Sequence, residues 1–330
     1  MISLEALYIL CRFFHFVTVM LMFGLSLCIT LLTSDHLSVL IRKRLKAALS
    51  ISTVAAFMTS IVWFIVQAGL MGDGWHDVYQ PEIWQAVLGT AFGKVWQWQL
   101  LIAMLAVGVI LFLRNNALCT NTNASQTTHF LLLGCSVILL SSHAFIGHAA
   151  MYEGELGQLL QLNQVIHLLS AGYWFGGLWP FLLCLQFLQL KSTRVLNSTS
   201  EKVDNPDKVN SGNIAKSLYD ESVAAMRRFS NYGHLAVFLV IVTGIVSSVI
   251  LIPGWPFFAV PVSEYQSMLW LKIILVTGMV ILALVNRYIL VPKLKQKGRY
   301  ELLMINSWLE IILGTAALLC VAIFATEPPV

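Results

Sequence analysis

Apolar residues along this chain come in eight long blocks that are separated by shorter polar segments. Each block is long enough for an α-helix to cross about 30 Å of hydrocarbon, which takes roughly 20 residues. The blocks predict helices over 5–32, 47–70, 95–113, 128–150, 159–190, 222–252, 266–290 and 301–325. The pattern therefore predicts an all-α fold, a polytopic membrane bundle of about eight transmembrane helices.

Composition agrees with a membrane protein. The 330 residues are 58% hydrophobic and 11% charged, whereas a soluble domain is about 25% charged. The first block has no basic segment before it and no small-residue cleavage site after it, so we interpret it as a retained span and not a signal peptide. The six cysteines are spaced singly, which argues against a zinc knuckle, a thioredoxin-like motif or a disulfide framework.

The basic residues predict the orientation of the bundle. Sixteen of the 20 lysines and arginines fall in or beside the first, third, fifth and seventh connections, while the other connections are acidic or neutral. Because positively charged loops stay on the cytoplasmic side, we expect both termini on the outer side. The net charge of +4 reflects these loops and does not indicate nucleic-acid binding.

Two long connections suggest how the chain is divided. The outer segment 71–94 contains glycines, a proline and two tryptophans, and predicts a re-entrant or interfacial element. The stretch 191–221 is largely polar, which predicts a flexible cytoplasmic linker. We therefore expect a five-helix membrane region over 1–190 and a three-helix region over 222–330.

Four of the eight histidines fall at a similar depth in the outer half of the predicted bundle. His15 is near the middle of the first span, His143 and His148 are in the outer part of the fourth, and His167 is in the outer third of the fifth. A histidine in hydrocarbon is costly without a partner, so this group indicates a metal or cofactor site. Any one of these histidines could instead form a hydrogen bond between helices.

Sulfur-containing residues accompany these histidines. Cys11, His15 and Met22 are spaced to share one face of the first span, and Met151 follows His148 by three residues. Imidazole, thioether and thiolate ligands suit copper ions, with sulfur favouring Cu(I). The combination therefore predicts a copper site.

The spacing of His143 and His148 creates a geometric difficulty. The two are five residues apart, which separates them by about 140° around a regular helix. Both can serve one site only if the fourth span distorts, and Gly147 makes such a distortion possible.

Most of the tryptophans are expected to lie at the membrane surface. Tryptophans are enriched where hydrocarbon meets the headgroups. We assign six of the ten to these aromatic belts, namely Trp75, Trp84, Trp96, Trp98, Trp179 and Trp255.

Several short sequence motifs are distributed along the chain. They are GTAFGKVW at 89–96, SHA at 142–144, GHA at 147–149, HLL at 167–169, GG at 176–177, RRFS at 227–230, LWLK at 269–272, LVNR at 284–287 and LVPKL at 290–294. With these motifs, most of the chain resembles the CopD/PcoD copper-resistance family of bacterial inner-membrane proteins. One departure is Lys94, where the family commonly has arginine; the charge is kept but the fork geometry is lost.

The resemblance implies a multi-pass inner-membrane protein of copper homeostasis that is not an enzyme. The family is associated with copper uptake across the inner membrane and with a periplasmic copper-binding CopC partner. Inward movement of copper ions is therefore the leading expectation. No phosphate-binding motif is visible, so we do not expect an ATP-driven pump. The candidate ligands are His15, His143, His148, His167, Met22, Met151 and Cys11, with Cys28 and Cys184 as weaker exit-path candidates.

Two other functions stay open at this point. A b-type haem redox protein also holds its iron between histidines of separate helices, and His15, His143 and His167 could fill that role. A copper sensor or assembly factor would bind copper without moving it across the membrane.

Overall fold

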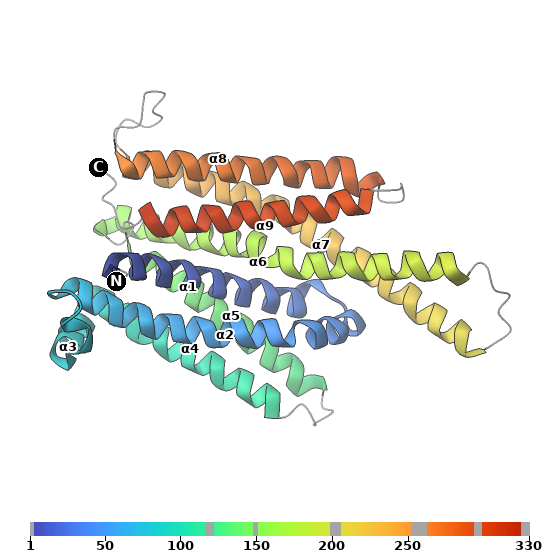
Figure 1. Ribbon diagram of the computed structural model, residues 1–330, viewed down its shortest axis with the longest axis horizontal. Coiled ribbons are helices and arrows are strands. Elements are labelled where there is room, and N and C mark those ends of the chain that lie inside the picture. Colours follow the sequence, from blue (N-terminus) through green and yellow to red (C-terminus); the bar gives the residue numbers. More distant parts are fainter. Residues whose placement is uncertain are drawn as a thin grey trace.

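The computed structural model describes residues 3–115, 122–147, 151–198, 206–252, 263–293 and 299–324, and these residues form a helical bundle (Figure 1). No strand occurs within these ranges. Their α-helices are α1 (Leu4–Leu27), α2 (Asp35–Met71), α3 (Pro81–Gly89), α4 (Ala91–Asn115), α5 (Thr122–Ser142), α6 (Gly154–Ser198), α7 (Pro206–Leu251), α8 (Glu264–Val285) and α9 (Arg299–Phe324). Tighter or wider helical turns extend some of them at η1 (Cys28–Leu32), η4 (His143–Phe145), η6 (Asn286–Leu290) and η7 (Val291–Lys293), and a separate 3₁₀ turn, η2 (Asp77–Tyr79), lies between α2 and α3.

Eight of the helices are long and apolar enough to cross a membrane, so the expected all-α fold with eight spans is confirmed. The helix ends differ from the expected ones at two places. α2 begins at Asp35, so the first basic cluster lies on its first turns and not in a loop. α6 runs to Ser198 and α7 begins at Pro206, so the expected linker over 191–221 is helical on both sides of 199–205. Proline at the first position of a helix favours its start.

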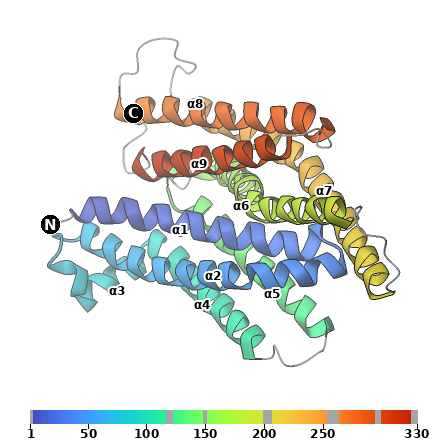
Figure 2. The ribbon, with the colours of Figure 1, turned by 45° about the vertical axis from the view of Figure 1, so that its right-hand side comes forward.

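α1 and α6 occupy the centre of the bundle. In Figures 1 and 2, α8 and α9 lie on one side of this pair, and α2, α4 and α5 lie on the other. Burial agrees with this arrangement, because 67% of the most apolar window of α1 and of α6 is buried, against 6% for α8. α1 begins and α9 ends at the same end of the bundle (Figure 1).

α1 and α6 approach each other at two glycines. A Cβ atom built on Gly24 of α1 would lie 2.1 Å from the carbonyl carbon of Gly176 on α6. Small residues allow such backbone contact between membrane helices, where dispersion and close packing hold the helices together. This crossing sets the position of α1 relative to α6.

The expected outer element, 71–94, contains the turn η2 and the short helix α3 between α2 and α4. The carboxylate of Asp77 organises its start by accepting a hydrogen bond from the backbone N–H of Asp73 at 2.6 Å. The ring Nδ1 of His76 lies 3.1 Å from the other carboxylate oxygen. These interactions lower the pKa of Asp77 below its ordinary value, and the hydrogen bond from the Asp73 backbone has the largest effect.

Replacing Asp77 with asparagine is expected to speed hydrogen exchange at the Asp73 amide at neutral pH, because a neutral oxygen is a weaker acceptor than a carboxylate. The wild-type amide should keep its protection above the ordinary pKa of about 3.9 and lose it as pH falls through the lowered value. Exchange measured by mass spectrometry on peptides from 71–80 tests this. Asp73→Asn removes the same charge but keeps the backbone donor, so equal loss of protection in both variants would contradict the assignment.

Candidate metal site

Two of the predicted histidines meet inside the N-terminal half of the bundle. His15, on α1, and His143, which begins η4 after α5, have ring centroids 5.0 Å apart. Their exposed fractions are 0% and 5%. The Nε2 atoms of both rings lie near one amide nitrogen, Nε2 of Gln99 on α4, at 2.8 Å for His15 and 3.2 Å for His143. Three helices therefore direct polar atoms to one buried point.

The other ring nitrogens fix the tautomer of each histidine. Nδ1 of His143 lies 2.7 Å from the carbonyl oxygen of Leu139, which can only accept, so this nitrogen carries the proton. Nδ1 of His15 lies 2.9 Å from the hydroxyl of Thr59. That hydroxyl donates to the carbonyl of Ala55 at 2.7 Å, so it accepts from His15. Both neutral rings therefore present an Nε2 lone pair to the site.

Gln99 occupies the point at which these lone pairs converge. Its NH₂ group has two hydrogens, one for each Nε2 atom. The Ser142 hydroxyl lies 3.1 Å from the amide oxygen and 2.8 Å from the carbonyl oxygen of Leu139. The two imidazoles have the arrangement of metal ligands, with Nδ1 donating to an oxygen and Nε2 free for the ion. A metal ion binding both rings would have to displace the amide.

Aromatic side chains enclose the pair. Phe16 lies 4.7 Å from the ring of His143, and Trp63 lies 5.4 Å from the ring of His15. Trp96 is fully buried and donates its indole N–H to the carbonyl of Ser60 at 3.0 Å. The assignment of Trp96 to an interfacial belt is therefore wrong, because Trp96 lies on the buried face of α4, one turn before Gln99. The enclosure keeps bulk water away from the histidines.

His167 has different hydrogen-bond partners from His15 and His143. Its Nδ1 atom lies 2.8 Å from the hydroxyl of Thr243 on α7. Asn163, one turn earlier on α6, donates to the carbonyl of Thr243 at 3.0 Å and to the hydroxyl of Ser247 at 2.9 Å. Here the polar residues join α6 to α7, and the hydrogen bond described for His167 goes to α7 and not to the His15–His143 pair.

The predicted sulfur ligands also lie apart from the pair. Cys11 and Met22 are buried on α1, about one turn before and two turns after His15. Met151 is 73% exposed just before α6. His148 lies outside the described residues. Within the ranges that the structure describes, no three His, Cys, Asp or Glu side chains form a metal-binding group.

The fourth span does depart from a regular helix, and it does so before Gly147. α5 ends at Ser142, and His143 starts the short 3₁₀ turn η4. Gly147 then has a φ of +130°, a conformation that favours glycine. The angle of about 140° for a regular helix therefore does not apply between His143 and His148.

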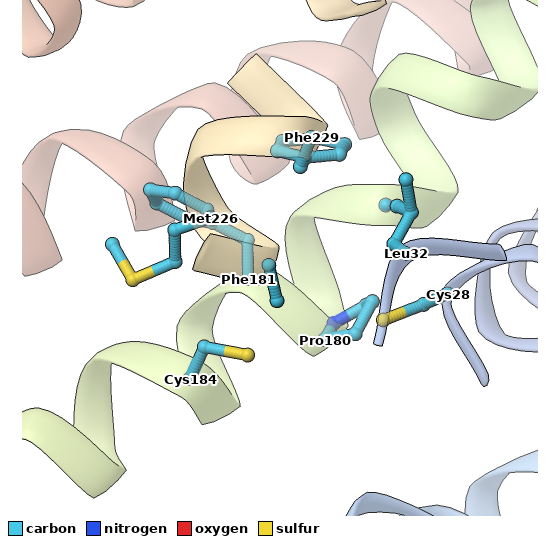
Figure 3. Close-up of a pocket in the computed structure, with 9 residues that line it drawn as sticks. Cys28, Leu32, Pro180, Phe181, Cys184, Met226 and Phe229 are labelled. Carbon is cyan, nitrogen blue, oxygen red and sulfur yellow. The ribbon is translucent and has the colours of Figure 1, made fainter. Parts of the chain in front are cut away.

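A second group of sulfur atoms lies around a small cavity where η1, α6 and α7 meet (Figure 3). Cys28 begins the π-helical turn η1, Cys184 follows Pro180 in α6, and Met226 comes from α7. All three line the cavity and are buried. π-helical turns often occur at functional sites.

Family models cover most of the chain. The model for the N-terminal domain of copper resistance protein D-like proteins matches residues 1–158, and the copper resistance protein D model matches residues 223–324. No solved structure matches.

Three curated proteins are similar over long stretches. Inner membrane protein YebZ of Escherichia coli (strain K12) is 32% identical over 324 residues, or 96% of this chain and 97% of that protein. Copper transport protein CutJ of Bacillus subtilis (strain 168) is 27% identical over 259 residues, or 78% of this chain and 41% of CutJ. Copper resistance protein D of Pseudomonas syringae pv. tomato is 24% identical over 306 residues, or 90% and 87%. The chain belongs to the copper resistance protein D family.

Proposed function

We propose that this protein moves copper ions inward across the inner membrane and holds the ion at His15 and His143 during passage. The family and the eight apolar spans identify a copper-related multi-pass protein of the inner membrane. The proposed role of His15 and His143 in holding the copper ion rests on the convergence of their two buried Nε2 lone pairs on one amide nitrogen. Imidazole nitrogen is a suitable ligand for copper.

Gln99 makes the site suitable for a transported ion, because such an ion must be released. When the ion leaves, the amide gives each ring a hydrogen-bond donor, so neither buried Nε2 atom is left without a partner. An unsatisfied buried acceptor would cost about 1–3 kcal/mol, whereas an exchanged hydrogen bond is worth about 1 kcal/mol. The exchange lowers the cost of emptying the site.

We infer that the path follows α1. Cys11, His15 and Met22 are spaced along this helix, Cys28 follows it at the start of η1, and all four are buried. Cys28 then reaches the cavity that Cys184 also lines. Thiol and thioether ligands favour Cu(I), so the order of these residues suits an ion that enters near the N-terminal end of α1 and passes through as Cu(I).

The membrane potential can drive such movement. An inside-negative potential favours inward transfer by about 2.3 kcal/mol per charge per 100 mV for a full crossing. The expected orientation, with both termini periplasmic, places the exposed Met151 on the side from which copper enters. We propose a periplasmic CopC-like protein as the donor at this surface.

The haem alternative receives less support from the geometry. Axial ligation would require the two Nε2 atoms on opposite faces of a porphyrin. Here both approach one amide nitrogen, and Trp63 and Trp96 pack beside the rings. The arrangement favours a single ion over a macrocycle.

Copper uptake by the purified protein in liposomes tests the proposal. With an inside-negative potential, we expect copper to enter protein-containing vesicles faster than empty vesicles. Bound copper without flux would indicate a sensor or assembly factor. A Soret band in the optical spectrum of the same preparation would instead favour the haem protein.

A further inference from the structure

A buried glutamate lies near the middle of the last span, and the copper path described above does not use it. Glu310 is 3% exposed and is located eleven residues after the start of α9. An ionisable side chain at this depth is expensive, and such residues usually mark ion pathways or proton relays. The position of Glu310 therefore requires an explanation beyond packing.

Neutral hydrogen-bond donors from two other elements hold the carboxyl group. The indole N–H of Trp174, on α6, donates to Oε2 at 3.2 Å. The side-chain amide of Asn286, at the start of the π-helical turn η6, donates to Oε1 at 2.7 Å. Asn306, one turn before Glu310 on α9, donates to the amide oxygen of Asn286 at 2.9 Å. In both hydrogen bonds the carboxyl oxygens are the acceptors, which suits the ionised form.

No cation balances this carboxylate among the residues whose contacts the structure gives. The guanidinium of Arg287, adjacent to Asn286, is directed to Ser230 and Asn231 on α7. Among the described residues, the titratable groups on the elements packed around α9 include Tyr8, Cys11, Arg12 and His15 on α1, Cys28 in η1 just after it, His167, Tyr173 and Cys184 on α6, Lys272 on α8, Tyr288 on η6, and Tyr300 and Cys320 on α9 itself. The hydrogen bonds and ion pairs given for Glu310 involve none of them. The carboxyl group therefore depends on Trp174 and Asn286 in its ionised form.

We propose that Glu310 is a proton-binding site that couples proton transfer to copper movement. The step is the addition of one proton to a carboxylate oxygen, which turns that oxygen from an acceptor into a donor. The indole N–H of Trp174 cannot become an acceptor. Asn286 can accept a hydrogen bond from the new O–H by turning its amide, and this turn breaks the bond that its amide oxygen now accepts from Asn306. Protonation therefore rearranges the contacts among α6, η6 and α9.

This rearrangement takes place beside the helix crossing that positions the proposed copper site. Trp174 lies two residues before Gly176, where the backbone of α6 meets the backbone of α1. A Cβ atom on Gly314 of α9 would lie 2.8 Å from the ring of Phe175, so α9 also packs closely on this part of α6. A change at Glu310 thus acts on the crossing that positions α1, the helix that carries His15. This coupling rests on the proposed transport of copper, whereas proton binding by Glu310 does not.

Infrared difference spectroscopy on the copper-free reconstituted protein tests proton binding. Across a pH titration, we expect the carbonyl stretch of a protonated carboxylic acid in wild type and its loss in Glu310→Gln. Trp174→Phe keeps the carboxyl group but removes one donor, so the band should persist at a shifted frequency. If Glu310→Gln does not fold, a shift in Trp174→Phe still assigns the band. A spectrum that is identical in wild type and both variants would overturn the proposal.

Copper uptake by the same proteoliposomes tests the coupling. We expect Glu310→Gln to reduce uptake and to lose the pH dependence of wild type, because an intramembrane carboxyl group of this kind marks a proton relay. Uptake by Glu310→Gln with the wild-type rate and pH profile would overturn coupling and leave copper transport standing. Absence of uptake in wild type would instead contradict the proposed function, while the infrared result would still decide proton binding.

Discussion

Alanine at His15, at His143 or at both positions is expected to reduce copper uptake by about 10- to 100-fold or more. Loss of an outer partner of a ligating histidine already costs about 10- to 100-fold in metal affinity or activity, and loss of the ligand itself should cost at least as much. The double variant should be little worse than either single variant, because each single change already dismantles the pair. Initial uptake rates in proteoliposomes measure all three.

Two other histidines provide controls for this experiment. His234 is exposed, and its ring nitrogens lie near the carbonyl of Ser230 and the hydroxyl of Tyr288, so alanine there should leave uptake unchanged. His167 distinguishes the larger ligand set predicted from the sequence from the pair seen in the structure. His167→Ala should remove an interhelical bond worth about 0.6 kcal/mol and keep most of the uptake. Normal uptake without His15 and His143 would contradict the proposed site.

The eight spans could be predicted from the sequence because lipid leaves few alternatives. Backbone groups in hydrocarbon must bond within their own segment, so a long apolar block there forms a helix. This constraint ends at the membrane surface. The polar stretches that begin α2 at Asp35 and α7 at Pro206 are helical, and hydropathy gives no reason to expect helix there.

Within the candidate site, the sequence indicates how deep each residue lies in the membrane but not toward which neighbouring helix its side chain faces. His15 and His143 could be selected because histidine is costly in hydrocarbon. Gln99 carries the same signal, a strongly polar side chain in an apolar span, but an amide is not a typical copper ligand and a ligand pattern therefore does not include it. Depth alone places Trp96 at the interface, whereas its burial depends on the face that α4 turns toward α2.

Glu310 is a second residue whose surroundings the sequence does not reveal. It is an acidic residue within a predicted span, which is a functional signal by itself. Its donors Trp174 and Asn286 come from distant parts of the chain, 136 and 24 residues away. Only the packing of α6 and η6 against α9 brings these side chains together, so the cluster could not be recognised from spacing along one helix.

Gly24→Ala is expected to destabilise the bundle, although alanine normally favours a helix over glycine by about 1 kcal/mol. The added Cβ would lie 2.1 Å from the carbonyl carbon of Gly176 and 2.5 Å from its Cα and oxygen. These are backbone atoms, so no side chain can rotate away and the helices must separate. Overpacking of this kind costs about 1–3 kcal/mol and occasionally more, which exceeds the gain in helix propensity.

Unfolding of the detergent-solubilised protein, followed by circular dichroism, measures this effect. Gly108→Ala on α4 and Gly134→Ala on α5 are matched controls, because a Cβ at either position meets nothing within 4 Å. These controls should be neutral or slightly more stable, since they gain helix propensity without a clash. Equal stability of Gly24→Ala and the controls would show that α1 and α6 do not meet at these glycines.

The same substitution also separates packing from ligand chemistry. Gly24→Ala leaves His15, His143 and Gln99 unchanged, but it moves the helix that carries His15 away from α6. If uptake depends on the distance between the two imidazoles, the variant should lose uptake even at temperatures where it stays folded. The reciprocal change, Gly176→Ala, places a Cβ 2.1 Å from the carbonyl oxygen of Met20 and should act in the same way. Loss of uptake in both glycine variants, with normal uptake in Gly108→Ala, would tie transport to the crossing of α1 and α6.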